Sequence, residues 1–244
     1  MEKINFYPFE KGIEEFAPPP VPASKMMPDW FRSIEPYMNG DKHSFRGGNE
    51  GQNGGGYFQN STAKKCLALF DTLVAGYYLL APADIYFEYV EGGEPIYKWR
   101  NDKYTFVLSH PMASNAPGYP LADHLDPVFM RWLPMWMGET PPGYSTLVTH
   151  PIHRNDLPFT TMTGIIDTDK LLPAGALPFN LHKGFKGIIK KGTPIAQIIP
   201  FKRDEWEHEI HSFVPDRLEK EALVINSAFS NVYKDNFWEK KSYN

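Results

Sequence analysis

Apolar and polar residues alternate in short runs along most of the chain, and this period of two is typical of half-buried β-strands. Ile85, Phe87 and Tyr89 alternate in this way just before residues 91–94, whose paired glycines predict a hairpin turn. Pro134 interrupts a later run and favours an edge strand or a bulge there. The predicted strands cover residues 4–9, 85–89, 96–100, 104–109, 129–137, 144–149, 159–166, 177–182, 187–190, 195–201 and 207–213.

Two other stretches carry apolar residues with the 3.6-residue period of a helix that buries one face. The first covers Thr62–Leu79 and ends before Pro82. Its expected buried face is Cys66, Leu69, Phe70, Leu73, Val74 and Tyr77. The second lies near residues 216–238, where Asp216 and Glu219 have the spacing of a capping box.

Together these elements predict a mainly β fold with two or three helices, arranged as a distorted β-barrel or a sandwich. Residues 1–60 are expected to form an irregular N-terminal arm, because residues 18–22 are proline-rich and residues 47–56 contain six glycines. Residues 61–244 are expected to form a single β-rich domain, since one β-rich core reaches this length without a second domain.

Composition narrows the function classes. The chain has 244 residues, a net charge of −4, 15% aromatic residues and 23 prolines. Its pI of about 6.1 gives no electrostatic reason to expect a nucleic-acid partner, which needs a clustered basic surface. Aromatic residues and prolines at this level favour strands joined by stiff turns over a helical bundle.

Cysteine and targeting signals point to an intracellular product. The single cysteine, Cys66, excludes an intrachain disulfide, and its apolar neighbours predict a buried thiol. The N-terminus lacks the long apolar segment of a signal peptide, and no run of about 18 apolar residues occurs. We therefore expect no membrane partner and a cytoplasmic location, in the host cytoplasm or the virion if a phage encodes the chain.

One group of residues has the composition of a metal site. His150, His153 and Asp156 are spaced three residues apart, and His182 could join them from a neighbouring strand. Zinc and iron sites need three or four ligands that converge on one point. A divalent metal is therefore a candidate cofactor, although the sequence does not require one. The alternative is that the two histidines are loop residues bonded to backbone.

Two phrases between residues 163 and 203 resemble a known enzyme family. Gly164–Asp169 is similar to the phrase Gly-Val-Ile-Asp-x-Asp of dUTPases and dCTP deaminases, and Gly192–Gln197 is similar to their later Gly-Asp-Arg-Ile-Ala-Gln phrase. The resemblance implies the β-clip fold of that family. It also implies a general base at Asp167, with Asp169 beside it, and a supporting hydrogen-bonding role for Gln197.

The site implied by this resemblance is incomplete. The family's tyrosine after Asp-x-Asp, which packs on the sugar, corresponds to Lys170, and the Arg-Gly after it is missing. The upstream Arg-Ser phosphate motif has only Tyr144-Ser145 or the region of Arg154 in its place, and the glycine-rich C-terminal arm is absent. Tyr144, Ser145, Arg154 and Lys170 are therefore the ligand-binding candidates. The resemblance implies a fold more than an activity.

A wider pattern resembles a second family. From Cys66 through residues 141–145 to Lys202-Arg203, the chain is similar to uncharacterised proteins from marine bacteria and their phages. That resemblance implies an origin in a phage or a marine metagenome, and it implies no known activity.

Two functions follow as hypotheses. The first is a non-catalytic structural or interaction protein that assembles as a homo-oligomer, which the incomplete site and the aromatic, proline-rich sequence favour. The alternative is a protein that binds a nucleotide or another small molecule, or hydrolyses it, with Asp167 and Asp169 in a dUTPase-like β-clip.

Overall fold

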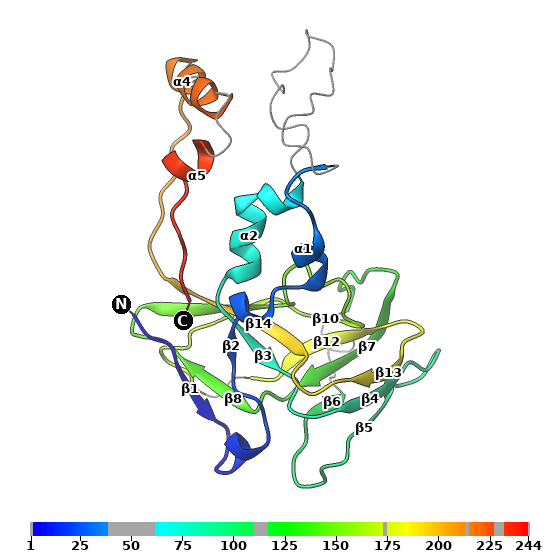
Figure 1. Ribbon diagram of the computed structural model, residues 1–244. Coiled ribbons are helices and arrows are strands. Elements are labelled where there is room, and N and C mark those ends of the chain that lie inside the picture. The colour runs from blue at the N-terminus through cyan, green and yellow to red at the C-terminus, as the bar shows by residue number, and fades with distance from the viewer. Residues whose placement is uncertain are drawn as a thin grey trace. The chain divides into compact units, whose positions relative to one another are not determined.

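A computed structural model describes residues 2–38, 62–109, 117–172, 175–212, 215–226 and 232–243. The chain divides into two compact units. The first comprises residues 1–25 and 76–204 and holds all of the described strands, whereas the second comprises residues 26–75 and 205–244 and holds the described α-helices (Figure 1).

The strands of the first unit are short, and most have three to six residues. They are β1 (Asn5–Pro8), β2 (Val21–Pro22), β3 (Tyr77–Leu80), β4 (Ile85–Glu88), β5 (Ile96–Lys98), β6 (Val107–Ser109), β7 (Leu125–Trp132), β8 (Trp136–Glu139), β9 (Tyr144–Thr149), β10 (Phe159–Thr161), β11 (Gly164–Ile166), β12 (Leu177–His182), β13 (Lys186–Ile189) and β14 (Pro194–Lys202). The helices are α1 (Asp29–Ser33), α2 (Leu67–Val74), α4 (Pro215–Asn226) and α5 (Val232–Asn236), with 3₁₀ turns η1 (Ile13–Glu15), η2 (Ala23–Met26) and η4 (Ala63–Lys65).

The described strands form four antiparallel sheets. The largest has the order β11-β9-β14-β3-β2, the second β10-β12-β7-β6, the third β13-β4-β5, and the fourth pairs β1 with β8. None of these sheets closes into a barrel in the described part of the chain. The prediction of a mainly β fold with few helices is confirmed, with short sheets in place of a barrel.

Aromatic side chains fill the core between the sheets of the first unit. Trp132 on β7 stacks on Phe179 of β12 with ring centroids 4.0 Å apart, and Phe87 and Phe159 meet this pair edge to face. All four side chains are inaccessible to solvent. Burial of rings of this size dominates core energetics, which explains why a chain with 15% aromatic residues builds its core from them.

The predicted helix over Thr62–Leu79 is shorter than expected. Helix α2 stops at Val74, and the chain turns at Gly76, whose φ of +64° favours glycine. A Cβ atom at Gly76 would lie 1.9 Å from the carbonyl oxygen of Ile198 on β14, so only glycine allows this close approach. The apolar residues from position 77 onward then form strand β3, because pairing with β14 buries them better than another helical turn would.

Cys66 is exposed, so the prediction of a buried thiol is wrong. It is the N-cap of α2, and its Sγ accepts a hydrogen bond from the backbone N–H of Leu69 at 3.5 Å. The residue type suggested a small buried hydrophobe, whereas its position at a helix start gives it a capping role.

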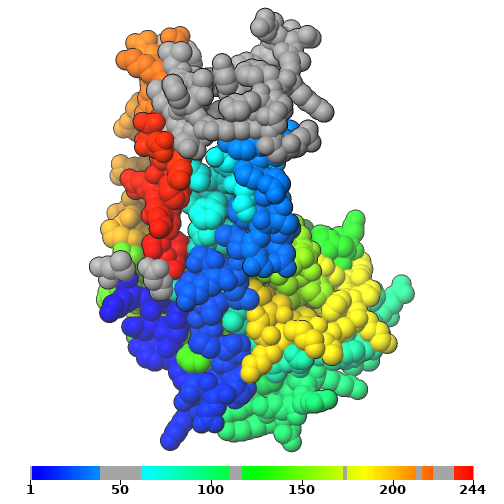
Figure 2. All heavy atoms as spheres, in the orientation of Figure 1, coloured from blue at the N-terminus to red at the C-terminus, as the bar shows by residue number. Residues whose placement is uncertain are grey.

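Three strand predictions need correction. The run 129–137 is two strands, since β7 begins at Leu125 and Pro134 separates it from β8. The run 159–166 is also two strands, β10 and β11, which belong to different sheets. The run 207–213 is not a strand: residues 203–212 have no helix or strand, and Phe213 lies outside the described residues. Residues 204–212 are exposed, and Figure 2 shows the light-orange atoms of this part of the chain at the surface.

Parts of the predicted N-terminal arm are ordered into the sheets. Strand β1 pairs with β8, and β2 pairs with β3. The glycine-rich loop predicted at residues 47–56 lies outside the described residues. Among the helices that are described, none is both long enough and apolar enough to span a membrane.

Candidate functional site

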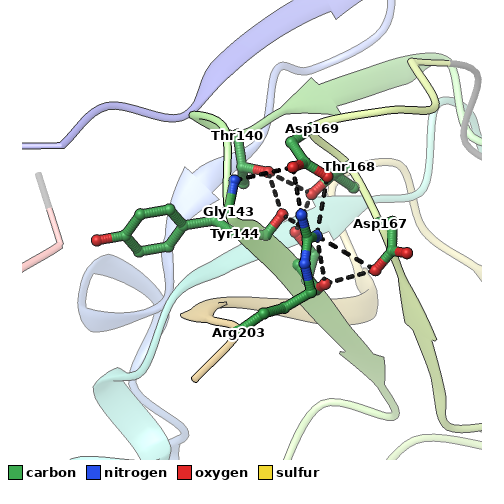
Figure 3. A network of polar contacts seen from close by, with 9 residues as sticks. Thr140, Gly143, Tyr144, Asp167, Thr168, Asp169 and Arg203 are labelled. Atoms are coloured by element: carbon green, nitrogen blue, oxygen red, sulfur yellow. Dashed lines mark hydrogen bonds and ion pairs between the residues drawn. The ribbon is translucent and has the colours of Figure 1, made fainter. Parts of the chain in front are cut away.

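Asp167 and Asp169 lie on the turn that follows β11. The turn is held by two hydrogen bonds to the carbonyl oxygen of Asp167, from the backbone N–H groups of Lys170 (2.9 Å) and Leu171 (3.0 Å). The two carboxylates converge on the guanidinium of Arg203, which follows the end of β14 (Figure 3). The pair predicted from the Asp-x-Asp phrase is therefore held at one place by a third residue.

Arg203 donates hydrogen bonds to both carboxylates. Its Nη1 donates to Asp169 Oδ1 at 2.8 Å and to Asp167 Oδ1 at 3.3 Å, and its Nη2 donates to Asp169 Oδ2. Nη1 also lies 2.9 Å from both the carbonyl oxygen of Tyr144 and the hydroxyl of Ser145, so its two protons are shared among four acceptors. We refer to Asp167, Asp169, Arg203 and Ser145 as the Arg203 clamp.

Asp169 is the buried carboxylate of the clamp. Its side chain is 5% exposed, whereas that of Asp167 is 51% exposed. The pKa of Asp169 is lowered from 3.8 to about 2, chiefly by the hydrogen bonds from Arg203 and against the opposing effect of burial. A hydrogen bond from the backbone N–H of Gly143 at 2.9 Å and the charges of Arg203 and Lys170 contribute to this lowering. Asp169 is therefore ionised at every pH above about 3.

Ser145 and Tyr144 are both predicted to bind a ligand; Ser145 belongs to the clamp, and the backbone carbonyl of Tyr144 accepts a hydrogen bond from its guanidinium. The buried Ser145 hydroxyl donates to Asp167 Oδ1 at 2.6 Å and accepts from Arg203. Tyr144 contributes its backbone carbonyl, while its ring points away from the carboxylates (Figure 3). The Ser145 hydroxyl and the Tyr144 carbonyl are thus used within the chain.

Three threonine hydroxyls extend the network. The Oγ1 atoms of Thr140 and Thr168 lie 2.7 Å apart, and those of Thr146 and Thr168 lie 2.8 Å apart. Thr140 Oγ1 donates its only proton to the carbonyl oxygen of Tyr144 at 3.1 Å. Since a hydroxyl has one donor, Thr168 must donate to Thr140 and accept from Thr146. The chain of bonds ties the turn after β11 to both ends of the β8–β9 connection.

The chemistry of Asp169 favours structure over proton transfer. An effective general base has a pKa near the working pH, so Asp169, with a pKa of about 2, is a weak base at neutral pH. Asp167, the base that the resemblance implies, accepts hydrogen bonds from Ser145 and Arg203. The clamp instead fixes three chain segments to one another: the start of β9, the turn after β11 and the end of β14. The backbone N–H of Arg203 also donates to the carbonyl oxygen of Gly143 at 2.9 Å, which completes that connection.

Gln197 and Lys170 lie apart from the chemistry predicted for them. Gln197 is fully buried, and its Oε1 accepts from the backbone N–H of Ile152 at 2.9 Å. It precedes Arg203 by six residues on an extended strand, a separation of about 20 Å. The structure therefore does not bring Gln197 to the two carboxylates. The Lys170 side chain is exposed, and its charge acts on Asp169 from outside.

The predicted metal ligands do not converge. Both ring nitrogens of His150 contact backbone groups: Nδ1 accepts from Thr161 N–H at 3.3 Å, and Nε2 lies 3.2 Å from the carbonyl oxygen of Arg154. This pattern fits the neutral tautomer with the proton on Nε2, and burial lowers the pKa of His150. Asp156 forms a bidentate ion pair with Arg154 at 2.8 and 2.9 Å.

The rest of the metal prediction gains no support. His153 is exposed on the loop, in a left-handed conformation with φ of 60°. Within the described ranges, no group of three histidine, cysteine, aspartate or glutamate side chains is placed to hold a metal ion. Arg154 was also predicted to bind a ligand. Its guanidinium is used in the bidentate pair with Asp156, and it does not belong to the Arg203 clamp.

Arg203 is the residue that the sequence interpretation missed. The chain was expected to lack an arginine next to Ser145, but the antiparallel register of β9 with β14 pairs Lys202 with Tyr144 and so brings Arg203 to that place. Pairing of the two predicted strands 144–149 and 195–201 could have indicated that Arg203 lies near Ser145. The sequence alone does not determine the register of that pairing.

Comparisons with protein-family models, with curated proteins and with solved structures give no match to this chain. The two family resemblances of the sequence therefore stay predictions.

Proposed function

We propose that the protein is a non-catalytic interaction protein that assembles with copies of itself through residues 205–212. The observation that carries the proposal is the exposure of Trp206 (88%) and Ile210 (93%) in a segment without helix or strand. Large apolar side chains gathered on one exposed segment are typical of an interaction surface.

The segment has the sequence of a strand, but none of the described strands pairs with it. Trp206, His208 and Ile210 fall on one face of an extended chain, and Glu205, Glu207, Glu209 and His211 fall on the other. Residues 204–212 form no backbone hydrogen bond with the described part of the chain. An extended segment with free N–H and C=O groups can pair with another strand by β-augmentation.

The Arg203 clamp supports this role because it fixes the point from which the segment leaves the first unit. The hydrogen bond from Arg203 N–H to the carbonyl oxygen of Gly143 is the last described backbone bond before α4. Because the start of the segment is fixed, the segment loses less conformational entropy when it pairs with another strand, which favours association.

A second copy of the same segment is a suitable partner. In an antiparallel pair of two copies centred on His208, Trp206 of each copy lies opposite Ile210 of the other. The dimer therefore contains two equivalent cross-strand contacts between Trp206 and Ile210. On the other face, Glu205 lies opposite His211, and His211 accompanies Glu209 within one chain at 3.2 Å.

One feature of this register opposes association. Glu207 of each copy lies opposite Glu209 of the other, and like charges directly opposite each other are destabilising. Salt screens charges on an exposed strand, with a Debye length of about 8 Å at physiological ionic strength. Association through this register should therefore become tighter as the salt concentration rises, unlike association driven by opposite charges.

The nucleotide-binding or hydrolytic alternative has less support. Asp167, the base implied by the dUTPase resemblance, accepts from both Ser145 and Arg203, and Asp169 is neutralised by Arg203. A ligand phosphate would have to compete with both carboxylates for the one guanidinium of the clamp.

Sedimentation velocity tests the proposal over a concentration range of about 1 to 100 μM, where complexes of moderate affinity dissociate. The chain alone has a mass of 27.9 kDa, and the dimer has twice that mass. A buried interface tryptophan typically contributes about 2 kcal/mol, so Trp206→Ser in both copies removes about 4 kcal/mol and weakens the dimer roughly a thousandfold.

Ile165→Ser is the matched control. Ile165 is 64% exposed on β11, so its replacement removes a comparable exposed apolar side chain from another part of the molecule. We expect the native chain and Ile165→Ser to dimerise equally and Trp206→Ser to remain monomeric. A monomeric native protein throughout this range, or equal dimerisation of Trp206→Ser, would overturn the proposal.

A further inference from the structure

A groove of about 510 Å³ opens beside the turn between β4 and β5, at the start of β7. It is far larger than the cavity of about 30 Å³ among apolar side chains near Trp136, which has room for no more than a water molecule. The residues that line the groove are Tyr89, Gly92, Gly93, Glu94, Asp126, Pro127, Val128 and Lys183. It shares no residue with the Arg203 clamp.

Asp126 is the unusual residue of this groove. It is 1% exposed, and one of its carboxylate oxygens, Oδ1, accepts from the backbone N–H of Val128 at 2.9 Å. The other oxygen, Oδ2, is buried and has no hydrogen-bond partner among the described residues. A buried carboxylate oxygen without a partner is rare, because leaving it unsatisfied destabilises the fold.

The local backbone holds Asp126 in this place. The register of β7 with β12 shifts between Asn180 and His182, so the β7 strand bulges at residues 126–128. The buried side chain of Asn180 donates to the carbonyl oxygens of Asp126 (2.9 Å) and Val128 (3.5 Å) and so stabilises the bulge. Bulges of this kind re-aim a side chain and are frequent next to binding sites.

We propose that the groove binds the primary ammonium group of a small aliphatic amine, with Asp126 Oδ2 as its anchor. Glu94 and Tyr89 also line the groove, so a second carboxylate and an aromatic ring, a group that attracts cations, are available there. The described residues place no third acidic, histidine or cysteine ligand there, which makes an organic cation a better fit than a metal ion.

The number of free acceptors selects an ammonium over a guanidinium. A guanidinium binds a carboxylate best through two parallel hydrogen bonds, but Oδ1 of Asp126 is already used by Val128. An ammonium is a compact charge with three donors, and it can bond one oxygen of Asp126 and one of Glu94.

The ammonium group of Lys183 does not form a hydrogen bond with the free oxygen of Asp126. Lys183 lines the groove, but its Nζ donates to the backbone carbonyl of Asp123 at 2.7 Å. Burial raises the pKa of Asp126 more than the Val128 N–H and the Lys183 charge lower it. Among the described residues, no cation forms an ion pair with this carboxylate, and an ammonium in the groove would supply one.

Titration with n-butylammonium, followed by amide NMR shifts of Gly92, Gly93 and Val128, tests this proposal. Butan-1-ol is the neutral control, since it has the same chain without the charge. We expect saturable shifts with the amine and none with the alcohol. Asp126→Asn should weaken binding at least tenfold, as expected for loss of a charge-assisted bond. Asp123→Asn, which makes the same charge change beside the groove, should leave the affinity within about twofold.

Glu94→Gln keeps the proposal testable if Asp126→Asn does not fold, because Glu94 is exposed. It should weaken binding of n-butylammonium about two- to fivefold, while Glu91→Gln in the same turn should have no effect. Equal binding of the alcohol, or equal loss of affinity in Asp126→Asn and Asp123→Asn, would overturn the proposal. So would unchanged affinity in both Asp126→Asn and Glu94→Gln.

Discussion

Substituting Arg203 by glutamine removes the guanidinium that holds both carboxylates of the clamp and leaves a polar side chain of similar reach. Arg203 is the largest cause of the lowered pKa of Asp169, which stands at about 2 in place of 3.8. Without it, burial raises the pKa, and only the Gly143 N–H and the charge of Lys170 oppose that effect. A return to the ordinary value corresponds to a gain of about 60-fold in the proton affinity of Asp169.

Carboxyl ¹³C NMR measures this change directly, with Asp169→Asn used to assign the signal. We expect Asp169 to titrate near 2 in the native protein and close to or above 3.8 in Arg203→Gln. Arg154→Gln is the control, since Arg154 pairs with Asp156 and lowers the pKa of that residue instead. A value for Asp169 that stays near 2 in Arg203→Gln would refute the assignment of the shift to the guanidinium.

The same pKa shift predicts how the clamp responds to acid. Because the pKa of Asp169 is lower in the folded than in the unfolded chain, its stabilising contribution is complete above pH 3.8. It is lost as the pH falls from 3.8 towards about 2. The difference in melting temperature between the native protein and Arg203→Gln should therefore narrow across this range.

Two further predictions concern stability. Gly76→Ala should lower the free energy of unfolding by at least about 1–3 kcal/mol, because φ there is +64° and the added Cβ would lie 1.9 Å from the Ile198 oxygen; an unchanged midpoint in urea would contradict this. Asp126→Asn should raise the melting temperature at about pH 7, since burial raises the pKa of Asp126 and its ionisation destabilises the fold above pH 3.8. The gain should vanish near pH 3, where both states are protonated, and its absence at neutral pH would show that Oδ2 is satisfied.

The strands were the most predictable part of the fold, because their pattern depends on neighbouring residues alone. The predicted runs 144–149 and 177–182 coincide with β9 and β12. Residues 177–182 alternate apolar Leu177, Phe179 and Leu181 with other residues, and proline and glycine lie near the ends of both runs. Sheet formation decided the rest: the residues near position 77 have helical spacing, but pairing of β3 with β14 made them a strand.

The candidate site was predictable only in part. The Asp-x-Asp phrase predicted two carboxylates on one turn. Ser145 was predicted separately, as the residue in place of the family's upstream phosphate motif. Arg203 lies 34 residues beyond Asp169, and it meets Asp169 only because β14 runs antiparallel to β9 in one register. The bulge at Asp126 is equally a property of strand pairing, so the groove beside it has no sequence signature.

Disulfide trapping tests the proposed pairing of residues 205–212 most directly. In a Cys66→Ser background, which removes the only cysteine, His208→Cys places the new thiol on the two-fold axis of the dimer. Directly opposite residues have Cα atoms about 4.5–5.5 Å apart, within the reach of a disulfide. Ser212→Cys is the control, because its two copies would lie about 27 Å apart. We predict a covalent dimer of His208→Cys and none of Ser212→Cys, whereas equal cross-linking of both, or of neither, would contradict the account.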